Sequence, residues 1–180
     1  MIFAGIPLKA RINDRYILEE IIMPYFSNLK DIKAVLFVGC EWYTAWYRKI
    51  FKNLEYWTLE MNSKNRIYGS SLHIVDVVEN VSDHFQPESL DVIFCNGVLG
   101  WGLDSPENFN RAVEGFALCL RPNGVLVLGW DDIPERKPFS HESLVEKYFN
   151  KMIFPPLKTS RFRCVSKYMH TFDFYIRKQS

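Results

Sequence analysis

Short apolar segments of strand length alternate with segments of helical pattern along most of this 180-residue chain. The expected strands lie at residues 33–39, 55–60, 72–76, 90–96 and 125–130. Helices are expected at residues 43–52 and from Ser105, which can cap a helix, to about Cys119. This alternation predicts an α/β fold with a doubly wound, Rossmann-like parallel sheet and helices on both of its faces.

The two ends of the chain add elements to this sheet. Residues 13–29 have helical spacing of apolar side chains, and Pro24 should kink or split that helix. A helix is also expected at residues 140–150. Two strand-like runs at 161–166 and 170–177 lie too close together for a helical crossover, so we expect an antiparallel hairpin at one edge. Residues 1–180 are interpreted as one domain, with 1–30 as a leading helical segment that packs on the core.

Composition excludes several classes of function. The net charge of +1 gives no reason to expect nucleic acid or a membrane as a partner. No apolar run approaches the ~18 residues of a membrane span, and no small-residue cleavage site follows the apolar start, so we expect a cytoplasmic protein. Its four cysteines form no Cys-x-x-Cys pair, so we expect no metal site.

In an open parallel sheet, ligands bind beyond the carboxyl ends of the strands, which directs attention to a few positions. Gly39 ends the first expected strand, and Glu60 ends the second, 21 residues later. A carboxylate at that position can accept hydrogen bonds from both hydroxyls of a ribose. Asp76 ends the third strand. It could accept from an adenine amino group with Val77 beside the ring, or it could cap the next helix.

The segment that follows the fourth strand is rich in glycine. It reads Asn96-Gly-Val-Leu-Gly-Trp-Gly-Leu-Asp104, and packing alone gives little reason for such a loop. Asn96 offers a donor and an acceptor, and Trp101 offers a flat face for a ring or a cation. Trp130 with Asp131 forms a second polar and aromatic cluster after the fifth strand. Either tryptophan could instead be a core residue.

Two of these segments resemble the class I S-adenosylmethionine-dependent methyltransferases. They are Phe85-Gln-Pro-Glu-Ser-Leu-Asp-Val-Ile-Phe-Cys-Asn-Gly-Val-Leu and Leu120-Arg-Pro-Asn-Gly-Val-Leu-Val-Leu-Gly. The resemblance implies seven strands in the order 3-2-1-4-5-7-6 with an antiparallel last strand. It implies S-adenosylmethionine as cofactor and S-adenosylhomocysteine as product. The residues expected to bind the cofactor are Gly39, Cys40, Glu41, Tyr43, Thr44, Glu60, Met61, Asp76, Val77, Asn96 and Gly97.

The first motif of that family is where this chain departs from the pattern. The family's loop reads Asp-x-Gly-Cys-Gly-x-Gly, whereas here the acid is replaced by Phe37 and the later glycines by Glu41 and Tyr43. Two outcomes are open. Glu41 could hold the cofactor's amino group while Tyr43 and Thr44 close the pocket, or these side chains could block the pocket and end methylation.

The resemblance implies a methyl transfer that needs alignment more than acid–base chemistry. Candidates for a general base are Asp104, Asp131 and His141. We expect a small polar metabolite as acceptor, such as a sugar or a sugar-like intermediate stacked on Trp101 and Trp130. One rival is a non-catalytic binding or partner protein of the same fold. A second rival, a nicotinamide-dependent oxidoreductase, lacks its three-glycine fingerprint. A homo-oligomer would form through edge strands or the leading helix.

Overall fold

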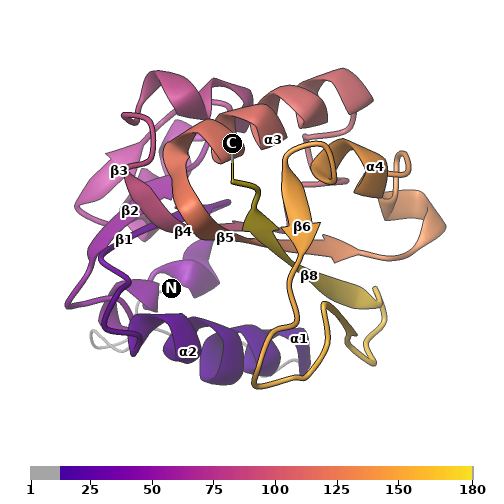
Figure 1. Ribbon diagram of the computed structural model, residues 1–180, viewed down its shortest axis with the longest axis horizontal. Helices are drawn as coiled ribbons and strands as arrows, with labels where there is room; N and C mark the ends of the chain where they lie inside the picture. Colours follow the sequence, from indigo (N-terminus) through magenta and orange to yellow (C-terminus); the bar gives the residue numbers. More distant parts are fainter. Residues whose placement is uncertain (1–12, 180) are drawn as a thin grey trace.

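The computed structural model describes residues 13–179, which form a mixed sheet covered on both faces (Figure 1). The strand order in this part of the chain is β3-β2-β1-β4-β5-β8-β6, and β7 also pairs with β8. The strands are β1 Ala34–Val38, β2 Glu55–Leu59, β3 Leu72–Ile74, β4 Leu90–Asn96, β5 Leu120–Asp131, β6 Phe149–Lys151, β7 Arg161–Arg163 and β8 His170–Arg177. The first five strands are parallel, and β8 is antiparallel to β5.

The topology confirms the expected strand order and adds one strand to it. β8 occupies the place of the seventh strand, between β5 and β6, and is antiparallel as predicted. β7 is an additional short strand that pairs with the start of β8, while β6 pairs with its end. The expected hairpin of 161–166 and 170–177 therefore forms. Its second strand lies inside the sheet, because β6 and β7 both cover its outer side.

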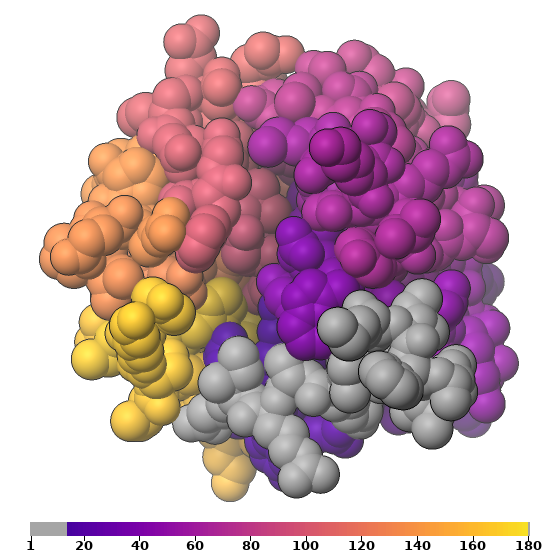
Figure 2. All heavy atoms as spheres, turned by 180° about the vertical axis from the view of Figure 1, so that it is seen from behind, coloured from indigo at the N-terminus to yellow at the C-terminus, as the bar shows by residue number. Residues whose placement is uncertain are grey.

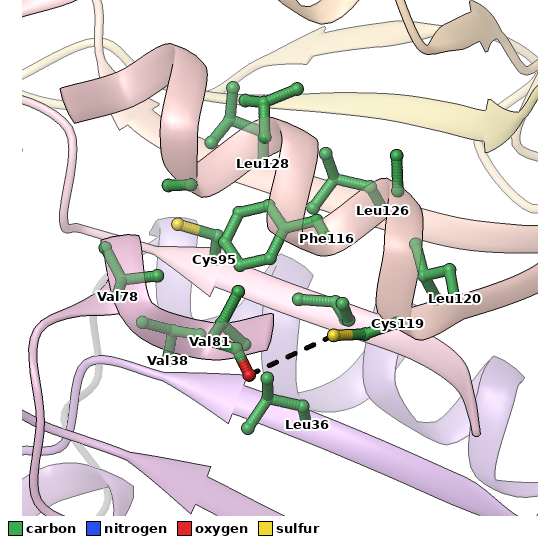
Figure 3. Packing of buried hydrophobic residues seen from close by; sticks show 14 of the residues in the cluster. Leu36, Val38, Val78, Val81, Cys95, Phe116, Cys119, Leu120, Leu126 and Leu128 are labelled. Atoms are coloured by element: carbon green, nitrogen blue, oxygen red, sulfur yellow. Dashed lines mark hydrogen bonds between the residues drawn. The ribbon is translucent and has the colours of Figure 1, made fainter. Parts of the chain in front are cut away.

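Successive residues of the central strands point to opposite faces, so the sheet has two cores. On one face Leu36, Cys95 and Leu128 pack under α3 (Pro106–Cys119), as Figure 3 shows. Ser105 caps this helix as predicted, by accepting from the Asn108 amide at 3.1 Å. α3 buries Phe109, Ala112, Val113 and Phe116, which have the spacing of one helix face. Each buried phenylalanine contributes roughly 1.5–3 kcal/mol.

The leading helical segment covers the opposite face of the sheet (Figure 1). It consists of α1 (Asn13–Tyr16), the π-helical segment η1 (Ile17–Ile22) and α2 (Met23–Ser27). The helix is not broken at Pro24, because Ile22 and Met23 both keep αR backbone conformations; it changes from π- to α-helical hydrogen bonding at Met23, next to Pro24. Ile22 and Phe26 are buried in this second core, which also contains Phe37 and Phe94 from the sheet.

Two expected helices are much shorter than the sequence predicted. In place of a helix at 43–52 there are two 3-10 turns, η2 (Trp42–Thr44) and η3 (Tyr47–Lys49). Aromatic and β-branched side chains are poor helix formers, and several of them are buried here. In place of a helix at 140–150 there are α4 (Glu142–Val145) and β6, because residues 149–151 pair with the free side of β8.

The connections after the strands carry further short helices. They are η4 (Ser63–Tyr68) after β2, η5 (Val78–Asp83) after β3 and η6 (Pro134–Arg136) after β5. Residues 121–124 form an irregularity inside β5, where the pairing with β4 shifts register and Asn123 has φ +62°. Because β1, β2, β3 and β4 are parallel, the loops that follow them meet at one edge of the sheet, where the strands have their carboxyl ends.

Candidate functional site

An open pocket of about 530 Å³, part of it open to solvent, lies at the carboxyl ends of the parallel strands. Figure 2 shows the molecule hollowed between the pink atoms near residue 100 and the purple atoms of the segments after β2 and β3. The walls consist of Val38, Gly39, Leu59, Glu60, Met61, Asp76, Val77, Val78, Glu79, Gly97, Val98, Trp101, Gly102 and Leu103.

Two predicted glycines give the pocket its floor. Gly39 has φ +92°, and a Cβ there would lie 3.0 Å from the Asn96 carbonyl oxygen and 3.1 Å from Val98 Cγ2. Only glycine therefore lets the loop after β1 turn this close to the end of β4. Gly97 has φ +67°, and no atom lies within 4 Å of the position of its absent Cβ. The backbone at Gly97 is accordingly open to a ligand.

Glu60 joins the loops that follow the first two strands. Its Oε2 accepts from the Cys40 amide at 3.1 Å, and its Oε1 accepts from the Asn62 amide at 2.8 Å. A carboxylate has about four acceptor positions, so two remain for a ligand in the pocket. Met61 is the next wall residue, and its Cε lies 3.5 Å from the position of the absent Cβ of Gly102. Met61 therefore spans the pocket toward the loop after β4.

Asp76 lines the pocket and also holds the turn into η5. Its Oδ1 accepts from the Val77 amide at 2.7 Å and from Asn80 Nδ2 at 3.0 Å, and its Oδ2 lies 2.8 Å from His84 Nε2. The hydrogen bond from His84 lowers the pKa of this carboxyl below its usual value. Asp76 is therefore a wall residue but not the N-cap of η5, which is Val77 without a side-chain cap; its contact with a ligand stays a prediction. Val77 is an exposed apolar wall residue beside it.

The atypical loop after β1 directs its side chains away from the pocket. Glu41 caps η2, because its Oε2 accepts from the Trp42 amide at 3.3 Å while its own amide donates to Thr44 Oγ1 at 3.1 Å. Asn65 Nδ2 donates to Glu41 Oε1 at 3.3 Å. Glu41 is exposed and Thr44 is buried, and neither is a wall residue. The prediction that they hold or close the pocket is corrected: they form a capping box.

Tyr43 and Cys40 are likewise engaged elsewhere. The Arg15 guanidinium lies 3.6 Å from the centre of the Tyr43 ring. Burial raises the pKa of Tyr43, and it raises the pKa of the Cys40 thiol to about 12, with the Glu60 charge adding to the second effect. The Cys40 side chain is therefore an inert thiol, and only its amide reaches Glu60. Tyr43 neither lines nor fills the pocket described above.

A chain of polar contacts runs from the end of β4 to the start of β8. Asn96 Oδ1 lies 3.1 Å from His170 Nε2, and His170 Nδ1 lies 2.6 Å from Asp131 Oδ1. Trp101 Nε1 donates to Asp131 Oδ2 at 3.2 Å. Burial alone would raise the pKa of Asp131, but His170, Trp101 and Arg136 together lower it. The start and the middle of the glycine-rich loop, at Asn96 and Trp101, are thus fixed by one histidine–aspartate pair.

These polar contacts give Asn96 and Asp131 roles that differ from those predicted from the sequence. The side chain of Asn96 lies over Gly129, with its Oδ1 1.9 Å from the position of the absent Cβ, and it is not a wall residue. Asp131 is buried and already bonded at both oxygens. His170 was not predicted as a site residue. Its place beside Asp131 could have been predicted, however, because the antiparallel last strand places His170 directly opposite Asp131.

Trp101 is half exposed at the pocket rim and carries a cation on its ring. The Arg136 guanidinium lies 3.5 Å from the ring centre, and Arg136 Nη1 donates to the Gly100 carbonyl at 3.3 Å. Arg136 was not predicted, since an arginine in a loop after β5 carries no signal in the sequence. Asp104 is exposed beyond the same loop, where its Oδ1 accepts weakly from the Gly102 amide at 3.4 Å.

Two predicted site residues belong to the core, and their assignments are corrected. Trp130 is 0 % exposed and donates from Nε1 to Asp173 Oδ2 at 2.8 Å, so no substrate can stack on it. His141 is also 0 % exposed and packs edge-on against Trp130, with ring centroids 4.7 Å apart. Its Nε2 lies 3.5 Å from the buried Asp173 Oδ2, the carboxylate oxygen that also accepts from Trp130. Neither can reach a substrate at the rim.

Two further classes of feature concern the described residues 13–179. No group of three or more His, Cys, Asp or Glu side chains in this part of the chain is placed to hold a metal ion. No helix within it is both long and apolar enough to cross a membrane.

The strand order, the antiparallel β8 and the pocket at the carboxyl edge define the fold of the class I S-adenosylmethionine-dependent methyltransferases. No protein-family model matches the sequence, and no curated protein matches it. The likeness is therefore one of structure, at low sequence identity.

Three solved structures illustrate it. The PH0226 protein from Pyrococcus horikoshii OT3 has a TM-score of 0.70 at 15% identity, over 94% of this chain and 92% of that one. The N-methyltransferase NodS from Bradyrhizobium japonicum WM9, in complex with S-adenosyl-L-homocysteine, has a TM-score of 0.66 at 15% identity, over 90% and 87%. A SAM-dependent methyltransferase from Archaeoglobus fulgidus has a TM-score of 0.60 at 10% identity, over 89% and 93%.

Proposed function

We propose that this protein is an S-adenosylmethionine-dependent methyltransferase that acts on a small polar metabolite. The observation that carries the proposal is Glu60, a carboxylate at the end of β2 that lines a pocket at the carboxyl edge of the sheet. The fold is that of NodS, which has been solved with S-adenosylhomocysteine. The bound cofactor would supply an activated methyl group, and S-adenosylhomocysteine would be the product.

The wall residues suit the parts of such a cofactor. Glu60 keeps two acceptor positions for the ribose hydroxyls. Met61 and Val77 are exposed apolar side chains that can flank the adenine ring. Gly39 and Gly97 let the backbone approach a ligand closely. The side chains of the atypical first loop leave this pocket open, which supports binding over a closed, non-catalytic fold.

The acceptor side of the proposal rests on the rim after β4. Trp101 presents half of its surface there, and Asp104 lies exposed close by. The net charge of +1 supports a small molecule over nucleic acid. Asp104 is the candidate base that remains solvent-accessible, and a base is needed only where the acceptor loses a proton, as a hydroxyl does. A screen that succeeded only with protein or RNA would overturn the small-molecule assignment.

Calorimetric titration with S-adenosylmethionine, and separately with S-adenosylhomocysteine, tests the cofactor site. Glu60→Gln should weaken either ligand at least about tenfold, or 1.4 kcal/mol, because a neutral amide accepts fewer hydrogen bonds than a carboxylate. The matched control is Glu55→Gln, at the opposite end of the same strand, where affinity should stay unchanged. Absence of binding by the folded wild-type protein would reject the enzyme and favour the partner-protein alternative.

A further inference from the structure

Arg136 is a cation that packs on the wall residue Trp101 and whose hydrogen-bonding capacity is largely unused. It ends η6, directly after β5, and is half buried. A guanidinium has five N–H donors, and the contact with the Gly100 carbonyl uses one of them. No carboxylate of the described residues lies within 4.0 Å of it. By contrast, Arg163 on neighbouring β7 is paired with Asp132 at 2.7 Å.

Arg136 is held in place by the loop after β4, and the Asp131 carboxylate interacts with it only at a distance beyond that of an ion pair. A Cβ at Gly100 would lie 2.1 Å from the Arg136 carbonyl oxygen, so the two backbones are in close contact there. The Trp101 ring supports the guanidinium at 3.5 Å from its centre, and Asp131 holds the indole N–H. The guanidinium plane is therefore fixed before any ligand binds, which lowers the entropic cost of binding.

We propose that Arg136, supported by Trp101, binds an anionic group of the methyl acceptor, either a carboxylate or a phosphate. The planar guanidinium matches such oxyanions because it can donate two parallel hydrogen bonds. Trp101 belongs to the pocket wall and Arg136, which is not itself a wall residue, packs on its ring, so a group bound at Arg136 would be separated from the pocket by no more than that indole. This inference rests on the proposed function and narrows the acceptor from a small polar metabolite to an acidic one.

The test uses simple anions as probes of the full-length protein saturated with S-adenosylhomocysteine. Sodium acetate and inorganic phosphate are titrated separately against sodium chloride of equal ionic strength, which removes general screening. Binding is followed through the indole N–H resonance of Trp101, assigned with Trp101→Phe. The variants are Arg136→Met and the matched control Arg163→Met, which removes a paired arginine from the same side of the sheet.

We expect a saturable shift with acetate or phosphate that chloride does not produce. Arg136→Met should weaken it at least about tenfold, and Arg163→Met should change it by less than about twofold. The stronger of the two probes identifies the group as carboxylate or phosphate. If Arg136→Met fails to fold, Arg136→Lys serves instead, since a lysine lacks the planar fork and should weaken the shift several-fold.

The outcomes separate this inference from the proposed function. Tight S-adenosylhomocysteine binding without a saturable anion shift, or with equal losses in both variants, overturns the anion site alone. If the protein does not bind S-adenosylhomocysteine, the same titration is carried out without it; anion binding that still depends on Arg136 keeps the site and rejects the methyltransferase assignment. Once the acceptor is known, its amide or ester analogue should raise KM in the wild type far more than in Arg136→Met.

Discussion

The contact between Gly100 and Arg136 predicts that Gly100→Ala destabilises the protein far more than Gly97→Ala. Both glycines lie on the loop after β4 and both have positive φ, +81° and +67°. An alanine costs about 1–2 kcal/mol in this region of backbone conformation. Restriction of the unfolded chain returns about 0.4–1 kcal/mol of that cost. Each variant should therefore lose roughly 1 kcal/mol from backbone strain alone.

The two positions differ in the space around the new methyl group. At Gly97 no atom lies within 4 Å of it, whereas at Gly100 the Arg136 carbonyl oxygen would lie 2.1 Å away. Contacts below 3.0 Å are essentially never seen, so the two backbone segments must separate by roughly 1 Å. Overpacking of this kind costs about 1–3 kcal/mol. Gly100→Ala should then lose about 2–4 kcal/mol in total.

Urea unfolding of the two variants and the wild type measures the difference directly. We expect a gap of about 1–3 kcal/mol between the variants, or a difference in Tm of several degrees for a chain of this length. Gly100→Ala should also weaken anion binding at Arg136, since the guanidinium would lose its fixed position. Equal stabilities would refute the close backbone contact, and with it the reason why the loop carries glycine at position 100.

Two further predictions concern buried polar groups. Asp131→Asn should cost about 2 kcal/mol at pH 7, because a charge-assisted contact with His170 is lost. The folded pKa of Asp131 is lowered, so this stabilisation is complete above the unfolded value of about 3.9 and disappears as pH falls through the folded value. The difference from wild type in urea should shrink accordingly at low pH; a constant difference would contradict the ion-pair account. Trp130→Phe should cost about 1.5–3 kcal/mol, because the buried Asp173 carboxylate loses a donor. Its cofactor affinity should equal that of the wild type, and a large loss of affinity would place Trp130 back in the site.

Much of the fold could be predicted because strands leave a direct signal in the sequence. The segment at 90–96 contains the continuous apolar run 92–95, and it forms β4 with the expected bounds. The helix at α3 was equally clear, because a capping serine and a proline mark its start. The helix expected at 140–150 failed for a non-local reason. Its second half pairs with β8, and that competition is invisible in a local pattern.

The residues of the candidate site likewise fall into those that a local sequence pattern predicts and those that depend on contacts between distant segments. Positions fixed by strand ends, such as Gly39, Glu60 and Asp76, do line the pocket, since the topology alone carries them there. A shift of one residue in strand register moves a side chain to the other face of the sheet, so the sequence does not fix the direction of a side chain at a strand end. Trp130 points into the core for that reason. Arg136 depends on a contact between two loops, which no periodicity encodes.

The departure of the first loop from the family's glycine pattern has a structural counterpart in Glu60. Where glycines would shape the loop by backbone freedom, this chain fixes it with hydrogen bonds: Glu60 binds the Cys40 amide, and Glu41 closes a capping box with Thr44. A ribose that used the remaining acceptor positions of Glu60 would therefore contact a residue that also sets the loop. Cofactor affinity and loop conformation are then coupled through a single carboxylate. For that reason a change at Glu60 should cost more affinity than the loss of its ribose contacts alone.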